Sequence, residues 1–552
     1  MNLSFINHKK SLFLVTFYFF AIIFGLLVFE DYGIHIEEKF HRLNGHYWLN
    51  YIAKILYLDE LNLITNSKIS SIYDYTLSRV SHYDKWGPIF DTIVAYLEIL
   101  LKLEDINQIY YFKHFLSYLF FLIGSFFFFK ILEYRFQNFY LSFFGLILYL
   151  TSPRIFGDSF LYKDVLYLSF FSITIYFFVK SLEKLDNLNL FFFSIFTAIS
   201  FNLRIFTILI PFLFFLILVI KNFYKKENLY FFKKFCFYCL SFIIFTFLTW
   251  PYLWSDPFNN FLNLFTAVKN DLVDIRILFF NEYVQNTLLP TKYILIWIFI
   301  SSPLLLNIIF VPGFFFCLIR VVRRLLSVKE ESLFNDLWRG SKEKVDFIIF
   351  IIFFSYFLFF MIFNAPFYNG WRLVYFFNYF IIYFGIYFLN YVIIFNKRKK
   401  KLKTIIFFSI FFFLSTITNI YNLYSFHPFQ SIYFNNFLSE KTINGFEGDY
   451  YGLSGKHFFN EIIKIDKKNN IKIAVASHTP LQRSLEALPS NLQKRFSIIG
   501  QDYSNADYIY KNNISEVNIK LNKKYQIPKN FSKIRDFKIK KILVYEIFKK
   551  NN

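Results

Sequence analysis

The sequence predicts an all-α polytopic membrane protein of about eleven transmembrane helices, with interfacial helices in the first outer loop and a small α/β soluble domain at the carboxyl end. Three observations predict this class. Of the 552 residues, 56% are hydrophobic, and they gather into blocks of about twenty, the length that crosses hydrocarbon as a helix. Dense Lys and Arg fall in short loops between the blocks. After about residue 426 the blocks stop and a soluble pattern begins.

The first apolar block, SLFLVTFYFFAIIFGLLVF at 11–29, follows Lys9 and Lys10. It has no small-residue cleavage site and is longer than the core of a signal peptide, so we expect it to be retained as a span. Blocks of suitable length predict the other spans at 109–130, 139–152, 164–181, 190–203, 205–221, 235–250, 291–319, 346–364, 372–396 and 404–424. The shortest blocks would need tilt or a thinned bilayer.

Three loops carry dense positive charge, at 221–234, 320–330 and 396–403. If every block crosses the membrane, these loops share one face, and Lys-rich and Arg-rich loops mark the cytoplasmic side. We therefore predict a multi-pass membrane protein with a cytoplasmic amino terminus. The chain then divides into a transmembrane domain at 1–426 and an extracytoplasmic α/β domain at 427–552.

Composition excludes several function classes. The net charge of +22 lies mainly in loops beside spans, so no nucleic-acid partner is expected. The three Cys lie in or beside apolar blocks, which argues against a disulfide framework or a Cys metal site. No P-loop, HExxH, G-x-S-x-G or strand-linked GxGxxG occurs. The nine His do not pair at metal-ligand spacing on one helix, so no cofactor is indicated, although a divalent cation stays open.

The first outer loop, at 30–108, has apolar residues at helical spacing with acids and bases between them. This pattern predicts amphipathic helices in the membrane interface. In the carboxyl-terminal domain, HFFNEIIKI at 457–465 predicts a helix. Short β-branched and aromatic runs predict strands at 471–477, 496–500, 506–511 and 541–548.

Candidate functional residues begin directly behind the first span. Glu30, Asp31, Glu37 and Glu38 place four carboxylates within nine positions. The carboxyl end of a helix carries partial negative charge, so acids there are mildly destabilising, and a solvated loop is the alternative to a functional role. In the next outer loop Asp164 opens a span, where helix capping is the alternative.

Cations lie near this second acid, since Arg154 and Lys163 belong to the same outer loop. Acidic groups presented from successive outer loops beside cations suit a pocket for an anionic headgroup with a carboxylate as general base.

On these motifs the chain resembles the GT-C class of multi-spanning glycosyltransferases, which use polyprenyl-phosphate sugars and include protein O-mannosyltransferases and lipid A aminoarabinose transferases. Asp31 matches the acidic position of the first loop and Asp164 that of the second. Many members place two acids side by side, whereas here Tyr32 follows Asp31. The resemblance therefore leaves Glu30, Glu37 or Glu38 as the partner acid.

Three further stretches fit the resemblance. Lys85 in SHYDKWGPIFD precedes a Pro, as a basic residue does in the lipid A branch, and a snorkelling Lys is the alternative. Arg372 in NAPFYNGWRLVYFFNYF lies at the outer end of a span, where it would hold a lipid-linked phosphate through its planar fork or simply join an aromatic belt. His427 begins the soluble domain among aromatic and acidic residues that suit sugar recognition or domain packing.

The resemblance implies an integral membrane glycosyltransferase of hexosyl or pentosyl type that acts on the non-cytoplasmic face of a bacterial inner membrane, with Asp31 as general base aided by Glu37, Glu38 or Asp164. Its partners would be a polyprenyl-phosphate-linked sugar donor, a lipid, glycan or protein acceptor, and membrane lipids. The alternatives are a transporter, a polysaccharide polymerase or ligase, and a non-catalytic scaffold. A transporter would favour two related halves and charges near mid-bilayer. Arg204 is the main charge among the spans, and FNLRIFT predicts that it lies in an outer-surface turn.

Overall fold

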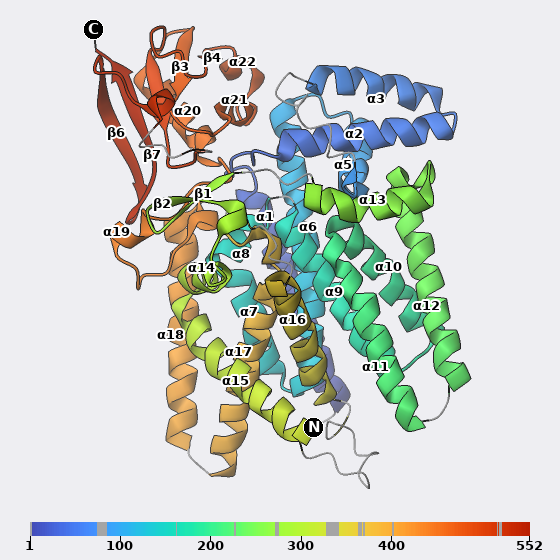
Figure 1. Cartoon of the computed structure of the whole chain (residues 1–552). Helices are drawn as coiled ribbons and strands as arrows, with labels where there is room; N and C mark the ends of the chain where they lie inside the picture. Colours follow the sequence, from blue (N-terminus) through green and yellow to red (C-terminus); the bar gives the residue numbers. More distant parts are fainter. Residues whose placement is uncertain are drawn as a thin grey trace.

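The computed structural model describes residues 3–73, 85–161, 163–225, 228–270, 275–326, 340, 342–362, 367, 370–399, 402–515, 517 and 522–551. Its helices run side by side as a long bundle, and a small sheet domain sits on one end of that bundle (Figure 1). We call this the sheet-bearing end. Both the first outer loop and the carboxyl-terminal domain lie there, so the candidate functional residues are gathered at one end of the molecule.

The bundle contains both long and short helices. They are α1 (Leu3–Val28), α6 (Ile106–Phe136), α7 (Phe139–Thr151), α8 (Pro153–Asp158), α9 (Asp164–Glu183), α10 (Asn187–Leu203), α11 (Leu209–Lys225), α12 (Asn228–Thr249), α14 (Tyr293–Ser301), α15 (Leu304–Leu326), α16 (Lys344–Ile362), α17 (Phe377–Arg398) and α18 (Leu402–Phe426). Within the described residues, seven helices are long and apolar enough to cross a membrane. Three shorter apolar helices accompany them, namely α7, α10 and the segment Ile205–Lys221, which includes most of α11. The all-α polytopic class is thereby confirmed.

The span predicted at 291–319 is wrong as a single helix. The structure divides this stretch into α14, which ends at Ser301, and α15, which begins at Leu304. The physical reason is Pro303, which lacks the N–H that a continuing helix needs and restricts the residue before it. The break gives Asn435, from the carboxyl-terminal part, a backbone partner, since its N–H donates to the Ile300 carbonyl at 2.9 Å.

Helix α17 lies in the core of the bundle, and its residues from Phe377 to Tyr387 are all buried. At the end of the bundle away from the sheet, Arg135 of α6 forms a two-bond pair with Asp346 of α16, at 2.7 and 2.6 Å. The Tyr383 hydroxyl of α17 donates to the same carboxylate at 2.7 Å. A buried pair with this geometry satisfies both charges and ties three helices together.

Four helices lie at the sheet-bearing end outside the bundle, with α2 and α3 running across its axis (Figure 1). They are α2 (Glu38–Ile55), α3 (Asp59–Ile72), α5 (Ile89–Leu100) and α13 (Pro257–Asn270). The helices predicted for the first outer loop are present as α2, α3 and α5. Buried ion pairs fix α2 to its neighbours: Glu98 of α5 accepts two hydrogen bonds from Arg42 and pairs with His46 at 3.1 Å.

The carboxyl-terminal domain is a five-stranded mixed sheet in the order β4-β3-β5-β7-β6. Its elements are α19 (Glu440–Ile443), α20 (Ser454–Ile465), β3 (Ile471–Val475), α21 (Leu481–Leu485), α22 (Ser490–Gln493), β4 (Phe496–Ile498), β5 (Tyr508–Lys511), β6 (Phe531–Ile539) and β7 (Ile542–Lys550). Strand β3 pairs in parallel with β4 and β5, whereas β7 pairs antiparallel with β5 and β6. The four predicted strands correspond to β3, β4, β5 and β7, and β6 was not predicted.

The soluble domain docks firmly on the first outer loop. Glu486, which follows α21, pairs with Lys39 at 2.8 Å and accepts from the Tyr110 hydroxyl at 2.8 Å. The Ile36 N–H donates to the Tyr451 carbonyl at 3.0 Å, so the two segments lie backbone to backbone. Gly33 allows the same close approach, because a Cβ there would stand 2.2 Å from the Leu453 carbonyl oxygen. A hairpin of β1 (Arg276–Phe279) and β2 (Glu282–Gln285) completes this end of the molecule.

Candidate active site

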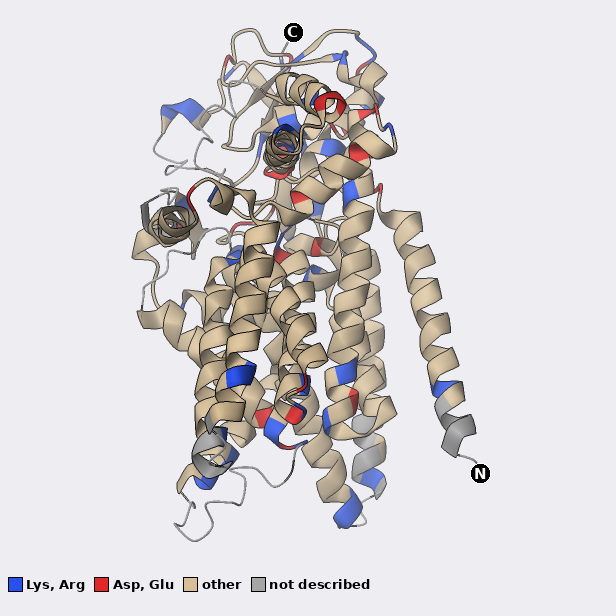
Figure 2. Cartoon of the chain, turned by 90° about the vertical axis from the view of Figure 1, so that its right-hand side faces the viewer, with Lys and Arg blue, Asp and Glu red and all other residues tan. Residues whose placement is uncertain are grey.

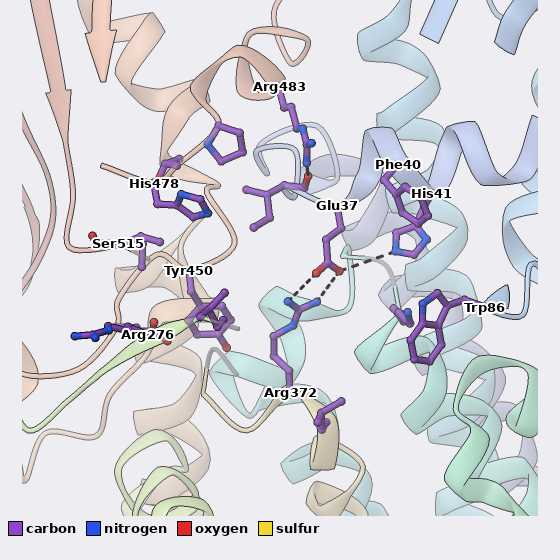
Figure 3. A pocket seen from close by; sticks show the side chains of 18 of the residues that line it. Glu37, Phe40, His41, Trp86, Arg276, Arg372, Tyr450, His478, Arg483 and Ser515 are labelled. Carbon is purple, nitrogen blue, oxygen red and sulfur yellow. Dashed lines mark hydrogen bonds and ion pairs between the residues drawn. The ribbon is translucent and has the colours of Figure 1, made fainter. Parts of the chain in front are cut away.

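A cavity of about 390 Å³ lies between the membrane part and the soluble domain (Figure 3). Segments far apart in the chain enclose it. Its lining is Ile36, Glu37, Phe40, His41, Trp86, Lys163, Arg204, Ile275, Arg276, Arg372, Leu373, Glu447, Tyr450, His478, Thr479, Pro480, Arg483, Ile514 and Ser515. Concave sites with a few convergent polar groups are where small molecules bind, so this cavity is the candidate active site.

Arg372 stands at the centre of the polar groups. It follows Gly370, whose φ of +71° makes the tight turn that only glycine adopts readily, and it opens the short 3-10 segment Arg372–Val374. Its guanidinium donates two hydrogen bonds to Glu37, at 3.2 and 2.9 Å, and one to Asp164 at 2.9 Å. The same guanidinium lies 5.0 Å from the ring centre of Tyr451. Arg372 is therefore held in place by both acids and by an aromatic face.

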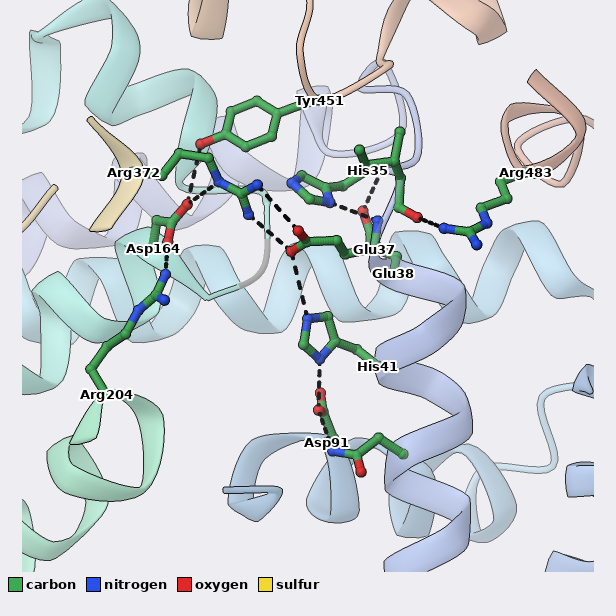
Figure 4. Close-up of polar contacts among 12 residues, drawn as sticks. His35, Glu37, Glu38, His41, Asp91, Asp164, Arg204, Arg372, Tyr451 and Arg483 are labelled. Atoms are coloured by element: carbon green, nitrogen blue, oxygen red, sulfur yellow. Dashed lines mark hydrogen bonds and ion pairs between the residues drawn. The ribbon is translucent and has the colours of Figure 1, made fainter. Parts of the chain in front are cut away.

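The ion pairs continue on both sides of Arg372, as Figure 4 shows. Asp164 also accepts a hydrogen bond from Arg204 and one from the Tyr451 hydroxyl at 3.3 Å. On the other side, Glu37 lies 4.0 Å from His41, which bonds Asp91 at 3.0 Å. Acids and bases thus alternate along one continuous row at the floor of the cavity.

Glu37 is the acid of this row that is open to the cavity. Its side chain keeps 32% exposure, whereas that of Asp164 keeps 2%. Burial alone would raise the pKa of Glu37, but the positive charge of Arg372 and the nearby His35 hold that pKa well below its ordinary value. Glu37 is consequently an ionised carboxylate in the resting site.

Lys163 supplies a further cation to the cavity. Among the described residues its ammonium makes no ion pair, and it lies 5.1 Å from the ring centre of Trp86. Its backbone φ of +87° lies in a region that residues other than glycine rarely adopt, and such backbone strain is often kept at functional sites. Burial, together with the nearby Arg204, lowers the pKa of Lys163 to about 8, so the group is charged near neutrality.

The soluble domain provides the other wall of the cavity. His478 and Thr479 follow the carboxyl end of β3, and Ser515 follows that of β5. These two strands are parallel, so all three residues come from the carboxyl-end edge of the sheet, where ligands of α/β sheets bind. Arg483 of α21 donates to the Ile36 carbonyl beside Glu37. Arg276 of β1 lies on the same side (Figure 3).

The cavity is positively charged overall. Its described lining contains five cations, which are Lys163, Arg204, Arg276, Arg372 and Arg483, against the two carboxylates of Glu37 and Glu447. Because a cleft lined by one sign of charge attracts ligands of the other sign, the cavity suits an anionic substrate. Figure 2 shows further Lys and Arg at the opposite end of the bundle, where they are separated from the cavity by the apolar helices.

The structure brings together four of the residues predicted from sequence, namely Glu37, Lys163, Asp164 and Arg372. Asp31 is elsewhere. It lies outside the cavity lining, its side chain is 51% exposed, and it pairs with His427 at 2.9 Å. Lys456 of α20 donates to the neighbouring Glu30 carbonyl, so this second cluster joins the end of α1 to the soluble domain.

The three remaining predicted residues also lie outside the cavity. Glu38 is fully buried and accepts from His114 at 2.9 Å. Arg154 is buried against the rings of Trp297 and Phe434, and it donates to the Tyr433 carbonyl at 2.9 Å. Lys85 lies in a separate small pocket, and its carbonyl accepts from Trp250 at 3.2 Å.

Sequence reasoning missed several cavity residues. Arg204 does lie at a turn, after α10, but it is buried in an ion pair with Asp164 rather than solvated. The sequence did contain a signal: Arg204 is an isolated charge among apolar blocks, and because an unpaired charge there is costly, it should have an acidic partner. Arg276, His478 and Arg483 gave no sequence signal, because their place depends on how the sheet domain docks. No group of three or more metal-ligating side chains occurs in the part of the chain that the structure describes.

The apolar bundle, the helices across its end and the docked sheet define a polytopic membrane protein with a polar cavity between its membrane part and its soluble domain. The chain is similar in structure to ArnT from Cupriavidus metallidurans bound to undecaprenyl phosphate, with 10% sequence identity and a TM-score of 0.40 over 84% of this chain and 87% of that one. No family model and no curated protein sequence matches the chain.

Proposed function

We propose that this protein is a membrane glycosyltransferase of the GT-C type, which moves a sugar from a polyprenyl-phosphate carrier to a hydroxyl group of a lipid, glycan or protein. The observation that carries the proposal is an ionised carboxylate, Glu37, open to a cavity whose other charges are mainly positive. Transfer from a lipid phosphate needs these two parts: cations for the departing phosphate and a base for the attacking hydroxyl.

The phosphate of the donor would bind between Arg372 and Lys163, with Arg204 behind them. The planar fork of Arg372 fits two phosphate oxygens, and Lys163 adds a cation that no acid in the described site neutralises. As the bond from the anomeric carbon to the phosphate oxygen breaks, the electron pair leaves with the phosphate, and these cations stabilise the charge that develops. Asp164 holds Arg372 and Arg204 in position.

Glu37 is the general base that we propose, in preference to Asp31, because its carboxylate lines the cavity. It would take the proton from the acceptor hydroxyl while the acceptor oxygen bonds to the anomeric carbon, which gives inversion at that carbon. In the resting site Arg372 engages both oxygens of Glu37. A donor phosphate that binds Arg372 competes with Glu37 and frees the carboxylate for the acceptor.

The test uses membrane vesicles that contain the protein, supplied with a panel of tritium-labelled undecaprenyl-phosphate hexoses and pentoses. We expect label from one donor to move into lipid, glycan or protein, and Glu37→Gln to abolish the transfer. Glu133→Gln is the matched control, because Glu133 forms an i, i+3 pair with Lys130 that is a third exposed and lies outside the cavity. The proposal is wrong if no donor in the panel is used, or if Glu37→Gln transfers label at the normal rate. Uptake of intact sugar by sealed vesicles would instead favour a transporter.

A further inference from the structure

His41 links the cavity to a buried acid that the proposed chemistry has not used. It lies in the first turns of α2, lines the cavity, and has a side chain that is only 6% exposed. Its Nδ1 lies 3.0 Å from the carboxylate of Asp91, which is 1% exposed in the first turn of α5. Its Nε2 lies 4.0 Å from Glu37. The two ring nitrogens therefore face two different carboxylates (Figure 4).

The environment of Asp91 fixes the protonation of the ring. An ionised carboxylate only accepts hydrogen bonds, so the Nδ1 that faces Asp91 carries the proton and Nε2 of the neutral ring presents its lone pair to Glu37. Asn44 donates to Asp91 at 3.4 Å and Lys113 of α6 lies 3.8 Å away, and both favour the ionised acid.

We propose that His41, oriented by Asp91, is the proton relay of the transferase and receives from Glu37 the proton that Glu37 takes from the acceptor. This inference rests on the function proposed above. The O–H bond of Glu37 breaks as an N–H bond forms at Nε2, and the carboxylate is regenerated. His41 lines the cavity and then gives the proton from Nε2 to water, which restores the neutral ring for the next cycle. The product is an imidazolium between two carboxylates, an arrangement that stabilises the positive charge. His41 acts through Glu37 and is a positioning residue in this scheme.

The surrounding charges suit a relay at neutral pH. Burial lowers the pKa of His41 and the carboxylate of Asp91 raises it, while Lys163 and Lys113 lower it further, with a net shift downward. The ring is therefore neutral and able to accept a proton near neutrality. When Glu37 leaves Arg372, His41 is the next member of the row in Figure 4, with its Nε2 4.0 Å from the Glu37 carboxylate.

The chain offers a matched control on the same two helices. His46 of α2 pairs with Glu98 of α5 at 3.1 Å, also fully buried, but neither residue lines the cavity. We expect His41→Gln to lower kcat by about a hundredfold, at the lower edge of general acid–base effects, with KM for the labelled donor unchanged. His46→Gln should keep the wild-type kcat. If His41→Gln folds poorly, His41→Ala supplies the second test, since added imidazole should restore its transfer.

The pH profile separates a relay from a structural contact. Wild-type transfer should fall at acid pH as His41 becomes protonated. Asp91→Asn removes the charge that favours the imidazolium, so the acid limb should move to lower pH while kcat falls. The inference is overturned if the wild-type protein transfers label and His41→Gln keeps its kcat, if imidazole fails to rescue His41→Ala, or if Asp91→Asn leaves the acid limb in place. Absence of transfer by the wild-type protein would overturn the proposed function itself.

Discussion

Replacement of Glu37 by Gln should affect lipid-phosphate binding and sugar transfer in opposite directions. In the resting site Glu37 occupies the fork of Arg372 through two hydrogen bonds, at 3.2 and 2.9 Å. A phosphate that binds the same fork must displace this carboxylate. Gln keeps the shape of Glu37 but removes its charge, so the competition weakens. The proposed base is lost at the same time.

The size of the effect follows from the contact that is lost. A hydrogen-bonded pair involving charged groups contributes about 1.5 to 3 kcal/mol, and the exposed third of Glu37 favours the lower end because solvent screens the pair. About 1.5 kcal/mol corresponds to roughly tenfold in a dissociation constant. We therefore expect Glu37→Gln to bind undecaprenyl phosphate about tenfold more tightly, while sugar transfer falls by about a hundredfold or more through loss of the base.

Titration of purified protein in detergent with undecaprenyl phosphate measures the first quantity, and label transfer in vesicles measures the second. Asp31→Asn is the control, because Asp31 comes from the same loop and lies outside the cavity. It should leave the affinity unchanged and transfer near the wild-type rate. Weaker binding by Glu37→Gln would refute the competition between Glu37 and phosphate. A hundredfold loss of transfer in Asp31→Asn alone would return the role of base to Asp31.

Three further outcomes are expected. Arg372→Lys replaces a planar fork by a point charge, so undecaprenyl phosphate should bind more weakly in the same titration, and unchanged affinity would contradict the phosphate site. The depressed pKa of Lys163, about 8, means that its charge is present below that pH and lost above it. Affinity for undecaprenyl phosphate should therefore fall as pH rises through about 8, and Lys163→Arg should remove this pH dependence, whereas an identical profile would exclude Lys163 from binding. Asp346→Asn leaves the buried charge of Arg135 uncompensated, so thermal unfolding should show a loss of about 3 kcal/mol or more, while a melting temperature like that of Glu133→Gln would refute the buried pair.

The bundle could be predicted from the sequence because apolar length is a local property. The predicted interfacial helices and the strands β3, β4, β5 and β7 are likewise encoded by short-range periodicity. The break between α14 and α15 was missed because both halves are equally apolar, so only Pro303 signals it. Strand β6 was missed because its middle residues, in FSKIRDFKI, are mostly exposed and polar, and its place depends on pairing with β7.

The candidate site could be predicted only in part, for geometric reasons. Glu37 and Glu38 are adjacent in sequence, but successive residues at a helix start point about 100° apart, so one faces the cavity and the other faces His114. The partnership of His41 with Asp91 spans 50 residues and depends on how α5 packs against α2. The sequence gives the positions of these polar residues along the chain, whereas tertiary packing decides which acid pairs with which base.

The order of the chain has a consequence for how the cavity is made. Its floor comes from the first outer loop and the segments near Lys163 and Arg372, whereas its roof, with His478 and Arg483, belongs to the last part of the chain. During synthesis the floor can insert and pair its charges long before the roof exists. A newly made chain therefore lacks the closed cavity, which forms only when the final domain has folded and docked.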